Sequence, residues 1–184
     1  MVMPDSWIIK MALENKMIEP FSQEQVKRGI SFGVSSYGYD MRVGTNFKVY
    51  QPISKDAVID PKDSSSANFK EIKTDNFILL EPNSYALAQS VEYFRIPRDI
   101  LTICFGKSTY ARCGVFVNVT PFEPEWEGFV TISIVNTSPS PVKVYANEGI
   151  AQVLFLHASE ICSVSYADKK GKYQAQKNIT HSKI

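Results

Sequence analysis

The sequence predicts a mainly β fold: a distorted β-barrel or jelly roll with an N-terminal helix and few short helices. After about residue 30 the chain consists of short runs rich in β-branched and aromatic residues, and Pro, Gly, Asn and Ser turn signals separate them. Its 184 residues suffice for one domain with a sizeable core, so we expect a single domain over residues 1–184. Many short strands in a domain of this size are typical of an antiparallel barrel or jelly roll. The predicted strands cover residues 47–51, 77–80, 85–89, 101–105, 115–119, 129–135, 142–145 and 151–156.

Three segments depart from the strand pattern. Residues 5–16 are predicted to form a helix that Asp5 or Ser6 can cap, because apolar residues follow at helical spacing. Residues 54–75 are polar and contain several serines, so we expect an excursion between two strands. Residues 166–184, called here the C-terminal segment, carry five lysines and one acid, and a solvated tail is the default expectation for such an end.

Composition argues against several classes of protein. The formal net charge is +1, which gives no global electrostatic case for a nucleic-acid or membrane partner. No apolar run approaches the roughly 18 residues of a membrane span, and the N-terminus lacks the features of a signal peptide. Cys104, Cys113 and Cys162 are odd in number and show no CxxC spacing. These cysteines favour a cytoplasmic protein over one built on disulfides.

Most familiar catalytic motifs are missing from the sequence. It contains no HxE…PCxxC signature of zinc deaminases, no GxSxG elbow, no GxGxxG turn and no Walker loop. Of the two histidines, His157 follows an apolar run and is expected to lie at a strand end. We therefore expect no metal site made of protein side chains, and a metal would arrive as Mg²⁺ on the phosphates of a nucleotide.

The most informative motif is GKSTYAR at residues 106–112. It places a lysine, two hydroxyl groups and an arginine within two helical turns after a glycine. Such a segment can open a short helix whose N–H groups and side chains bind phosphates. The motif predicts a phosphate site, although an exposed helix start is an equally simple interpretation of these residues alone.

Further motifs follow and precede GKSTYAR in a fixed order. They are CGVFVNVTP at 113–121, EPEWEG at 123–128, ANEGIAQ at 146–152, YAD and KYQAQ between 166 and 176, and SSYGYD at 35–40. In this order and spacing the whole chain resembles the dCTP deaminases of the trimeric dUTPase-like superfamily. The resemblance implies a distorted β-barrel or jelly roll and a homotrimer with active sites at subunit interfaces. It also implies conversion of dCTP and water to dUTP and ammonia without zinc, with Mg²⁺ on the triphosphate. The product would feed the pyrimidine deoxynucleotide pathway to dUMP and dTTP, and dTTP is a possible inhibitor.

The resemblance also implies roles for individual residues. Ser108 and Arg112 match the family's essential serine and arginine, which organise the water and hold charge near it. Glu123 falls where the family has an acid that contacts the deoxyribose 3′-hydroxyl. On this resemblance the C-terminal segment is a lid that folds over the triphosphate. The nucleotide-binding positions implied are Lys107, Ser108, Thr109, Tyr110, Ala111, Arg112, Glu123, Thr131, Ile132, Ser133, Gln152, Tyr166, Lys172 and Gln176.

Ser133 departs from the family pattern. Family members carry a glutamate at this position of the strand after the Trp-x-Gly turn, where it is the general base and acid. Strand alternation puts Ile132 and Ile134 on one face and Thr131 and Ser133 on the other. A serine hydroxyl does not by itself accept a proton near neutral pH, and loss of a positioned acid/base typically costs about 10²–10⁴-fold in rate.

Three interpretations of this departure stay open. The first is a working deaminase in which another carboxylate, from among Glu123, Glu125 and Glu127, replaces the base. The second is a catalytically weak nucleotide-binding homotrimer. The third is a dUTPase-like diphosphatase, which the sequence supports less because the turn FEPEWEG at 122–128 differs from the dUTPase motif.

Two charged residues, Asp40 and Arg42, lie shortly before the first predicted strand. Asp40 and Arg42 alternate with Met41 and Val43, as in a half-buried strand. The glycine–tyrosine steps just before them indicate a tight backbone path. We expect the two charges to lie at a subunit interface.

Overall fold

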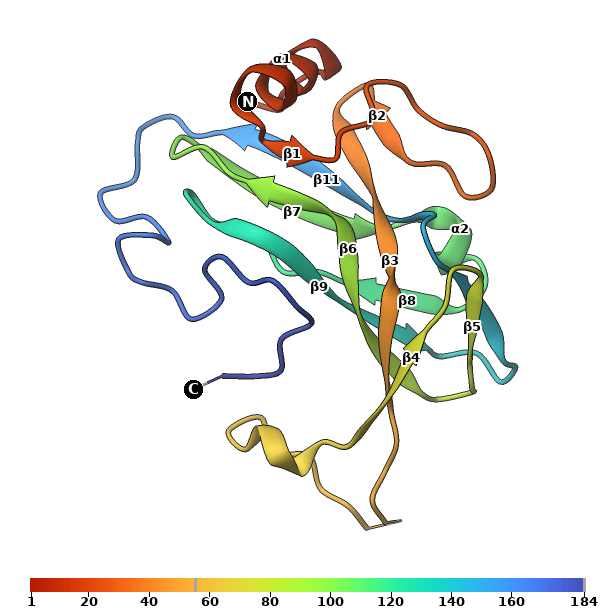
Figure 1. Cartoon of the computed structure of the whole chain (residues 1–184). Coiled ribbons are helices and arrows are strands. Elements are labelled where there is room, and N and C mark those ends of the chain that lie inside the picture. Colours follow the sequence, from red (N-terminus) through yellow and green to blue (C-terminus); the bar gives the residue numbers. More distant parts are fainter. Residues whose placement is uncertain (55, 184) are drawn as a thin grey trace.

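The chain folds into a large, strongly curved sheet with a small two-stranded sheet beside it (Figure 1). This computed structural model describes residues 1–54 and 56–183. Ile184, the last residue of the expected lid, lies outside the described residues. The elements in chain order are α1 (Asp5–Asn15), β1 (Ile18–Glu19), β2 (Gly33–Ser35), β3 (Gly38–Tyr50), η1 (Ser64–Ser66), β4 (Phe69–Lys73), β5 (Phe77–Leu80), β6 (Tyr85–Arg95), β7 (Ile100–Gly106), α2 (Ser108–Ala111), β8 (Val115–Asn118), β9 (Glu127–Asn136), β10 (Val142–Tyr145) and β11 (Gly149–His157).

The large sheet curls until its two edges approach each other. Its strands follow the order β7-β11-β3-β6-β9-β8, with β1 added to β6 and with β2 and β4 added to β3. Strands β7 and β8 stand at opposite ends of this order, yet Gly106 packs against Val117 so closely that a Cβ at Gly106 would lie 2.9 Å from the Val117 Cβ. The predicted mainly β, barrel-like fold with an N-terminal helix is therefore confirmed.

The core lies inside the curved sheet and follows strand alternation. In β9 the side chains of Ile132 and Ile134 are fully buried, whereas Thr131 and Ser133 are only half-buried. Strand β6 alternates in the same way, and its register opposes Leu87 to Ser133. Because side chains alternate between the two faces of a strand, burying the isoleucines turns the polar residues of β9 to the other face. The predicted alternation of this strand is confirmed.

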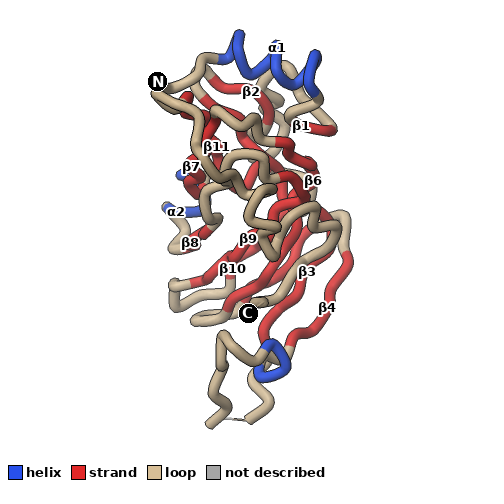
Figure 2. The backbone as a smooth tube through the Cα atoms, turned by 90° about the vertical axis from the view of Figure 1, so that its left-hand side faces the viewer, coloured by secondary structure: helices blue, strands red, loops and turns tan. Residues whose placement is uncertain are grey.

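Helix α1 lies across one end of the sheet (Figure 2) and buries Ile8 and Ala12. The predicted cap is wrong, because Pro4 holds the N-cap position and no side chain caps the helix. The Asp5 carboxylate instead accepts a hydrogen bond from the Ser6 N–H at 2.7 Å. Asp5 is the first helical residue, where its negative charge suits the helix dipole.

Several strands are longer than the sequence predicts. Strand β3 begins at Gly38, and β6 continues to Arg95. Strand β4, Phe69–Lys73, lies within the segment expected to be an excursion, because it pairs with the far half of β3. Long-range pairing therefore extends the strands beyond their local apolar runs. Within the described ranges, no helix is long and apolar enough to cross a membrane.

Candidate functional site

A cavity of about 720 Å³ lies between strand β9, the loop that precedes it and the C-terminal segment. Its size suits a small-molecule ligand, since such pockets typically measure roughly 300–1,000 Å³. Five of the nucleotide-binding positions implied by the sequence meet here, although they span more than fifty residues of chain. They are Glu123, Thr131, Tyr166, Lys172 and Gln176. Trp126, Tyr173, Thr180 and His181 also line this cavity.

The C-terminal segment docks on β9 through hydrogen bonds. Gln176 pairs with β9 through its backbone, because its C=O accepts from the Phe129 N–H at 3.0 Å. Its side-chain amide donates to the Phe129 carbonyl and to Thr131 Oγ1. Thr131 Oγ1 also accepts from the Thr180 N–H at 3.1 Å, and Trp126 Nε1 donates to the Tyr173 carbonyl at 2.9 Å. Thr131 and Gln176 thus hold the segment over the cavity.

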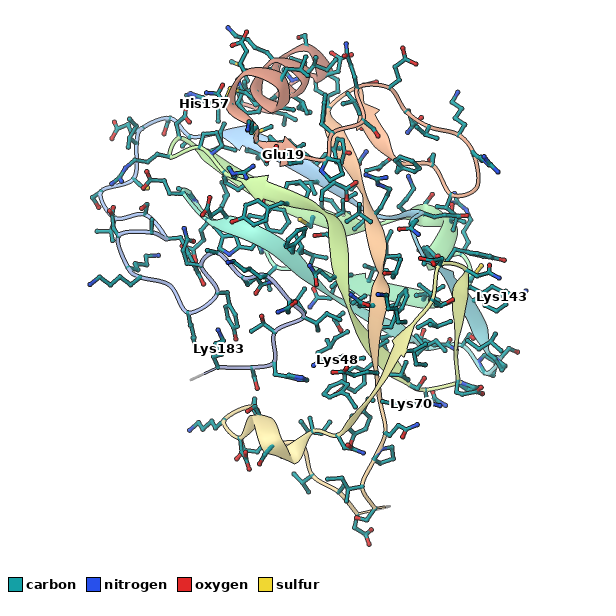
Figure 3. The ribbon with its side chains drawn as sticks, viewed as in Figure 1. Glu19, Lys48, Lys70, Lys143, His157 and Lys183 are labelled. Carbon is teal, nitrogen blue, oxygen red and sulfur yellow. The ribbon has the colours of Figure 1, made fainter. Side chains whose placement is uncertain are left out.

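The end of this segment contacts the β3–β4 hairpin. His181 packs against Phe69, with ring centroids 5.0 Å apart, and its Nε2 lies 3.2 Å from Lys48 Nζ. Lys48 also forms an ion pair with Glu71 at 3.2 Å. Figure 3 shows Lys48 between β3 and the last residues of the segment. An ammonium group only donates, so the contact requires an unprotonated Nε2 as acceptor.

The phosphate motif occupies a different part of the molecule. Lys107 is the N-cap of α2, and its N–H donates to the Ile150 carbonyl of β11 at 3.0 Å. Its Nζ lies 2.7 Å from Asp40 Oδ2 and 3.1 Å from Ser31 Oγ. Asp40 is 3% exposed and also accepts from Gln25 Nε2. The expectation that Asp40 lies at a subunit interface is therefore corrected, because it is buried within its own chain.

Beyond Lys107 the motif divides into a buried and an exposed part. Tyr110 is buried, its hydroxyl accepts from the Tyr145 N–H at 3.0 Å, and burial raises its pKa to about 12. Ser108, Thr109, Ala111 and Arg112 are exposed. In the part of the chain that the structure describes, Arg112 makes no ion pair. The motif therefore offers a hydroxyl-rich turn and a cation to solvent.

The remaining implied positions lie apart from the cavity. The Gln152 side chain donates to Ser35 Oγ at 2.9 Å, and Gln152 opposes Asp40 in the β11–β3 register. Gln152 therefore lies beside Asp40, the partner of Lys107 at the start of α2. The Ile132 side chain faces the core, so only its backbone is available to a ligand. None of residues 107–112 lines the cavity, and Figure 1 shows α2 on the side of the sheet away from the C-terminal segment.

Ser133 lies in the middle of β9, opposite Leu87 of β6 and Asn118 of β8. The side chain is half-buried on the same face as Thr131. No carboxylate stands at these neighbouring positions. The two residues that directly oppose Ser133 in its sheet are therefore neutral.

All three carboxylates considered as replacements are held by cations. Glu123 pairs with Lys169 at 2.8 Å, and this hydrogen bond raises the pKa of the Lys169 ammonium. Glu125 pairs with Arg98 at 2.7 Å. Glu127 lies 3.9 Å from the Arg95 guanidinium. Only Glu123 of the three lines the cavity.

Several contacts of the site carry no signal in the sequence. The sequence gives no partner for Lys107, and Asp40 is 67 residues away from it. Thr180 and His181 lie in a basic, polar end without periodicity. Their places follow from tertiary packing on β9 and β4, which no local pattern encodes.

A family model and the sequences of known proteins indicate the same family for this chain. A family model described as dCTP deaminase-like matches residues 2–158. A dCTP deaminase from Acidobacterium capsulatum is 59% identical over 181 residues, which cover 98% of this chain and 97% of that protein. A dCTP deaminase from Chlamydia abortus is 60% identical over 183 residues, covering 96% and 95%.

A solved structure shares the fold. The 2'-deoxycytidine 5'-triphosphate deaminase from Agrobacterium tumefaciens superposes with a TM-score of 0.64 at 15% identity. The match covers 84% of this chain and 47% of that one, so the chain spans about half the length of the solved protein. Identity at this level shows the fold alone, whereas the family model and the close relatives establish kinship. The chain belongs to the dCTP deaminase family.

Proposed function

We propose that this protein is a hydrolase that converts dCTP and water into dUTP and ammonia. The water oxygen bonds to C4 of cytosine and the bond from C4 to the amino nitrogen breaks. One water proton ends on N3 of the uracil ring, and the other leaves on ammonia. The observation that supports this proposal best is the gathering of Glu123, Thr131, Tyr166, Lys172 and Gln176 around one cavity of about 720 Å³. The proposed role lies in the supply of dUTP to the pyrimidine deoxynucleotide pathway.

We propose that each complete site uses two subunits of a homotrimer. Ser108, Thr109 and Arg112 are exposed and lie outside the cavity of their own chain. Phe105 and Phe116, on the strands that flank α2, are 57% and 61% exposed. Large exposed apolar side chains beside exposed polar groups are typical of an interface. A neighbouring copy would bring the α2 motif to the cavity, where it binds the triphosphate.

The metal is proposed to be Mg²⁺ that enters with the triphosphate. In residues 1–54 and 56–183, no group of three or more His, Cys, Asp or Glu side chains could hold a metal ion. Mg²⁺ commonly takes phosphate oxygens and water as ligands, so the proposed ion would be held by the triphosphate and not by protein side chains. Bound there, the ion would neutralise part of the triphosphate charge, while Lys107, Lys172 and Arg112 supply further cations.

We propose that Ser133 limits the rate of the chemical step. The proton that water releases needs an acceptor, and a serine hydroxyl does not serve near neutral pH. Glu123 is the carboxylate on the cavity wall, but it is engaged in an ion pair with Lys169 at 2.8 Å. We therefore expect ordinary dCTP binding and slow turnover. A catalytically weak nucleotide-binding trimer is the second candidate, and Ser133 is the observation that favours it.

The C-terminal segment is proposed as a lid over the bound triphosphate. It spans the cavity through Tyr166, Lys172 and Gln176 and is held by Thr131. dTTP carries the same triphosphate and deoxyribose, so we propose that it competes for the site. A cytoplasmic location is proposed on the three free cysteines.

The proposal is tested by incubating the purified protein with dCTP and Mg²⁺ and separating the nucleotides by chromatography. Formation of dUTP in equal amount with ammonia supports the deaminase. Formation of dUMP would instead reveal a diphosphatase of the dUTPase type. Unchanged dCTP together with measurable dCTP binding by calorimetry would leave the binding protein as the function. Absence of both turnover and binding would overturn the whole proposal.

A further inference from the structure

Asp40 is the most thoroughly buried carboxylate near the proposed phosphate motif. Its side chain is 5% exposed, and Oδ2 accepts from Lys107 Nζ at 2.7 Å and from Gln25 Nε2 at 3.1 Å. A buried charge is costly unless it is paired and hydrogen-bonded. Lys107 and Gln25 therefore satisfy the Asp40 carboxylate, and this carboxylate in turn fixes the position of the Lys107 ammonium group.

Lys107 is constrained at both its backbone and its side chain. Its N–H donates to Ile150, and its C=O accepts from the Tyr110 and Ala111 N–H groups that open α2. Its ammonium group has three donors, of which two are directed to Asp40 and Ser31. The side chain is 12% exposed, so the third donor is the one available to a ligand.

We propose that Asp40 is a positioning residue for triphosphate binding. It holds the Lys107 ammonium at the start of the phosphate motif, and it acts on the nucleotide only through Lys107. This inference rests on the proposed function, because it assumes that residues 107–112 bind phosphate. It predicts that Asp40 matters for phosphate-bearing ligands and not for the nucleoside itself.

The pairing has a physical advantage over a free lysine. A free lysine side chain samples many rotamers, and a ligand must otherwise remove much of that rotamer entropy on binding. Lys107 is already ordered by Asp40 and Ser31 before any ligand arrives. An ordered cation binds phosphate at lower entropic cost, which is preorganisation in its usual sense.

The test compares dCTP and deoxycytidine on Asp40→Asn. Binding of Mg²⁺–dCTP is measured by calorimetry, and deoxycytidine is measured as a competitor against it. We expect dCTP to bind about 10-fold to 100-fold more weakly, the range for losing a hydrogen bond to a charged group. Deoxycytidine binding should change by less than about twofold on the same reasoning.

A double-mutant cycle with Lys107→Met separates positioning from general support. If Asp40 acts through Lys107, Asp40→Asn weakens dCTP binding in the native background and has no further effect in the Lys107→Met background. Equal weakening in both backgrounds, or equal loss for dCTP and deoxycytidine, would overturn the proposal. Failure of the native protein to bind dCTP at all would instead refute the proposed function.

Two further variants guard against misfolding. Glu92→Gln is the matched control, because Glu92 is also fully buried and holds Arg42 at 2.7 Å, and none of its side-chain hydrogen bonds among the described residues reaches Lys107. It should lower Tm without changing the ratio of dCTP to deoxycytidine affinity. If Asp40→Asn does not fold, Ser31→Ala removes the other Lys107 partner and leaves the carboxylate in place. A smaller loss confined to dCTP is expected from it, and an unchanged dCTP affinity counts against positioning.

Discussion

The cavity half and the α2 half of the proposed site differ in where their polar groups find partners. In the cavity half, Gln176 Nε2 and the Thr180 N–H both donate to Thr131 Oγ1 and close the C-terminal segment over β9. In the α2 half, Lys107 is tied inward to Asp40, whereas Arg112 points to solvent without an ion pair among the described residues. The polar groups of the cavity half thus bond within one chain, whereas the α2 half presents a cation to solvent.

Within one chain, residues 107–112 of the phosphate motif do not line the ligand-sized cavity. Among the described residues, the cavity is lined by aromatic and polar side chains and by one lysine, Lys172. The triphosphate carries several negative charges that one lysine does not balance. We therefore interpret the α2 half as the contribution of each chain to its neighbour, as proposed above.

The largest expected effect comes from placing a carboxylate at position 133 of β9. Ser133→Glu should raise kcat for deamination by about 10²–10⁴-fold, the usual contribution of a positioned acid/base. Initial rates of dUTP formation under saturating dCTP provide the measurement. Ser133→Gln is the matched control, because it has nearly the same shape and cannot accept the proton. Equal rates for both variants would show that size at position 133, and not basicity, governs the reaction.

The second prediction concerns the division of the site between subunits. In the Ser133→Glu background, Arg112→Gln and Gln176→Ala should each lower kcat/KM by about 10²-fold, since each removes a contact proposed for the nucleotide. Mixed trimers assembled from the two variants should recover about one third of the parent activity, because one of the three interfaces in each mixed trimer joins the two intact halves. Dual-tag purification and native mass spectrometry verify the mixture.

The outcome of mixing decides how the halves combine. Recovery of activity requires that the intact α2 motif of one chain meets the intact cavity of another. Verified mixed trimers without recovered activity would mean that Arg112 and Gln176 serve a site within one chain. The different hydrogen bonding of the two halves would then result from local packing, and the site would not be shared between subunits.

Sequence reasoning succeeded where a local pattern carries the information. The period-2 alternation of residues 130–136 correctly places Ile132 and Ile134 in the core and Ser133 on the opposite face. It could not find the Asp40–Lys107 pair, whose partners are 67 residues apart, or the Gln176–Thr131 bond across 45 residues. Such contacts depend on how strands and loops pack in three dimensions, so the motifs indicated the site residues without dividing them into two halves.

The third prediction tests how firmly the cavity half is closed. Thr131→Val removes the oxygen that accepts from both Gln176 Nε2 and the Thr180 N–H. Leaving such donors without a partner costs about 1–3 kcal/mol, so amide hydrogens of residues 174–183 should exchange about tenfold faster or more. Hydrogen-exchange mass spectrometry of the free protein measures this directly.

Thr120→Val is the control for that experiment. Thr120 lines the same cavity, and its side chain forms no hydrogen bond to the C-terminal segment as far as the structure describes the chain. Exchange of residues 174–183 should stay at the native rate in this variant. Similar acceleration in both variants would indicate that the cavity wall as a whole, and not Thr131, holds the segment.

The smallest expected effect is a pH dependence of the same closure. Burial, and then the nearby Lys48 ammonium, lower the pKa of His181 below its ordinary value of 6.5. The closed segment therefore binds fewer protons than the open one between the lowered pKa and 6.5, and closure gains stability as pH rises through that window. Closure is strongest above pH 6.5 and weakens as pH falls and the imidazole becomes a cation facing Lys48.

His181→Asn should remove this dependence, because the amide does not titrate. Exchange of residues 174–183, corrected for the intrinsic effect of pH, should accelerate between pH 7 and pH 5.5 in the native protein and stay level in the variant. His157→Asn is the matched control, since that histidine pairs with Asp99 at 3.1 Å on another surface. Loss of the acceleration in the His157 variant would assign the effect to a global change, whereas its persistence ties the acid sensitivity of the cavity half to the Lys48–His181 contact.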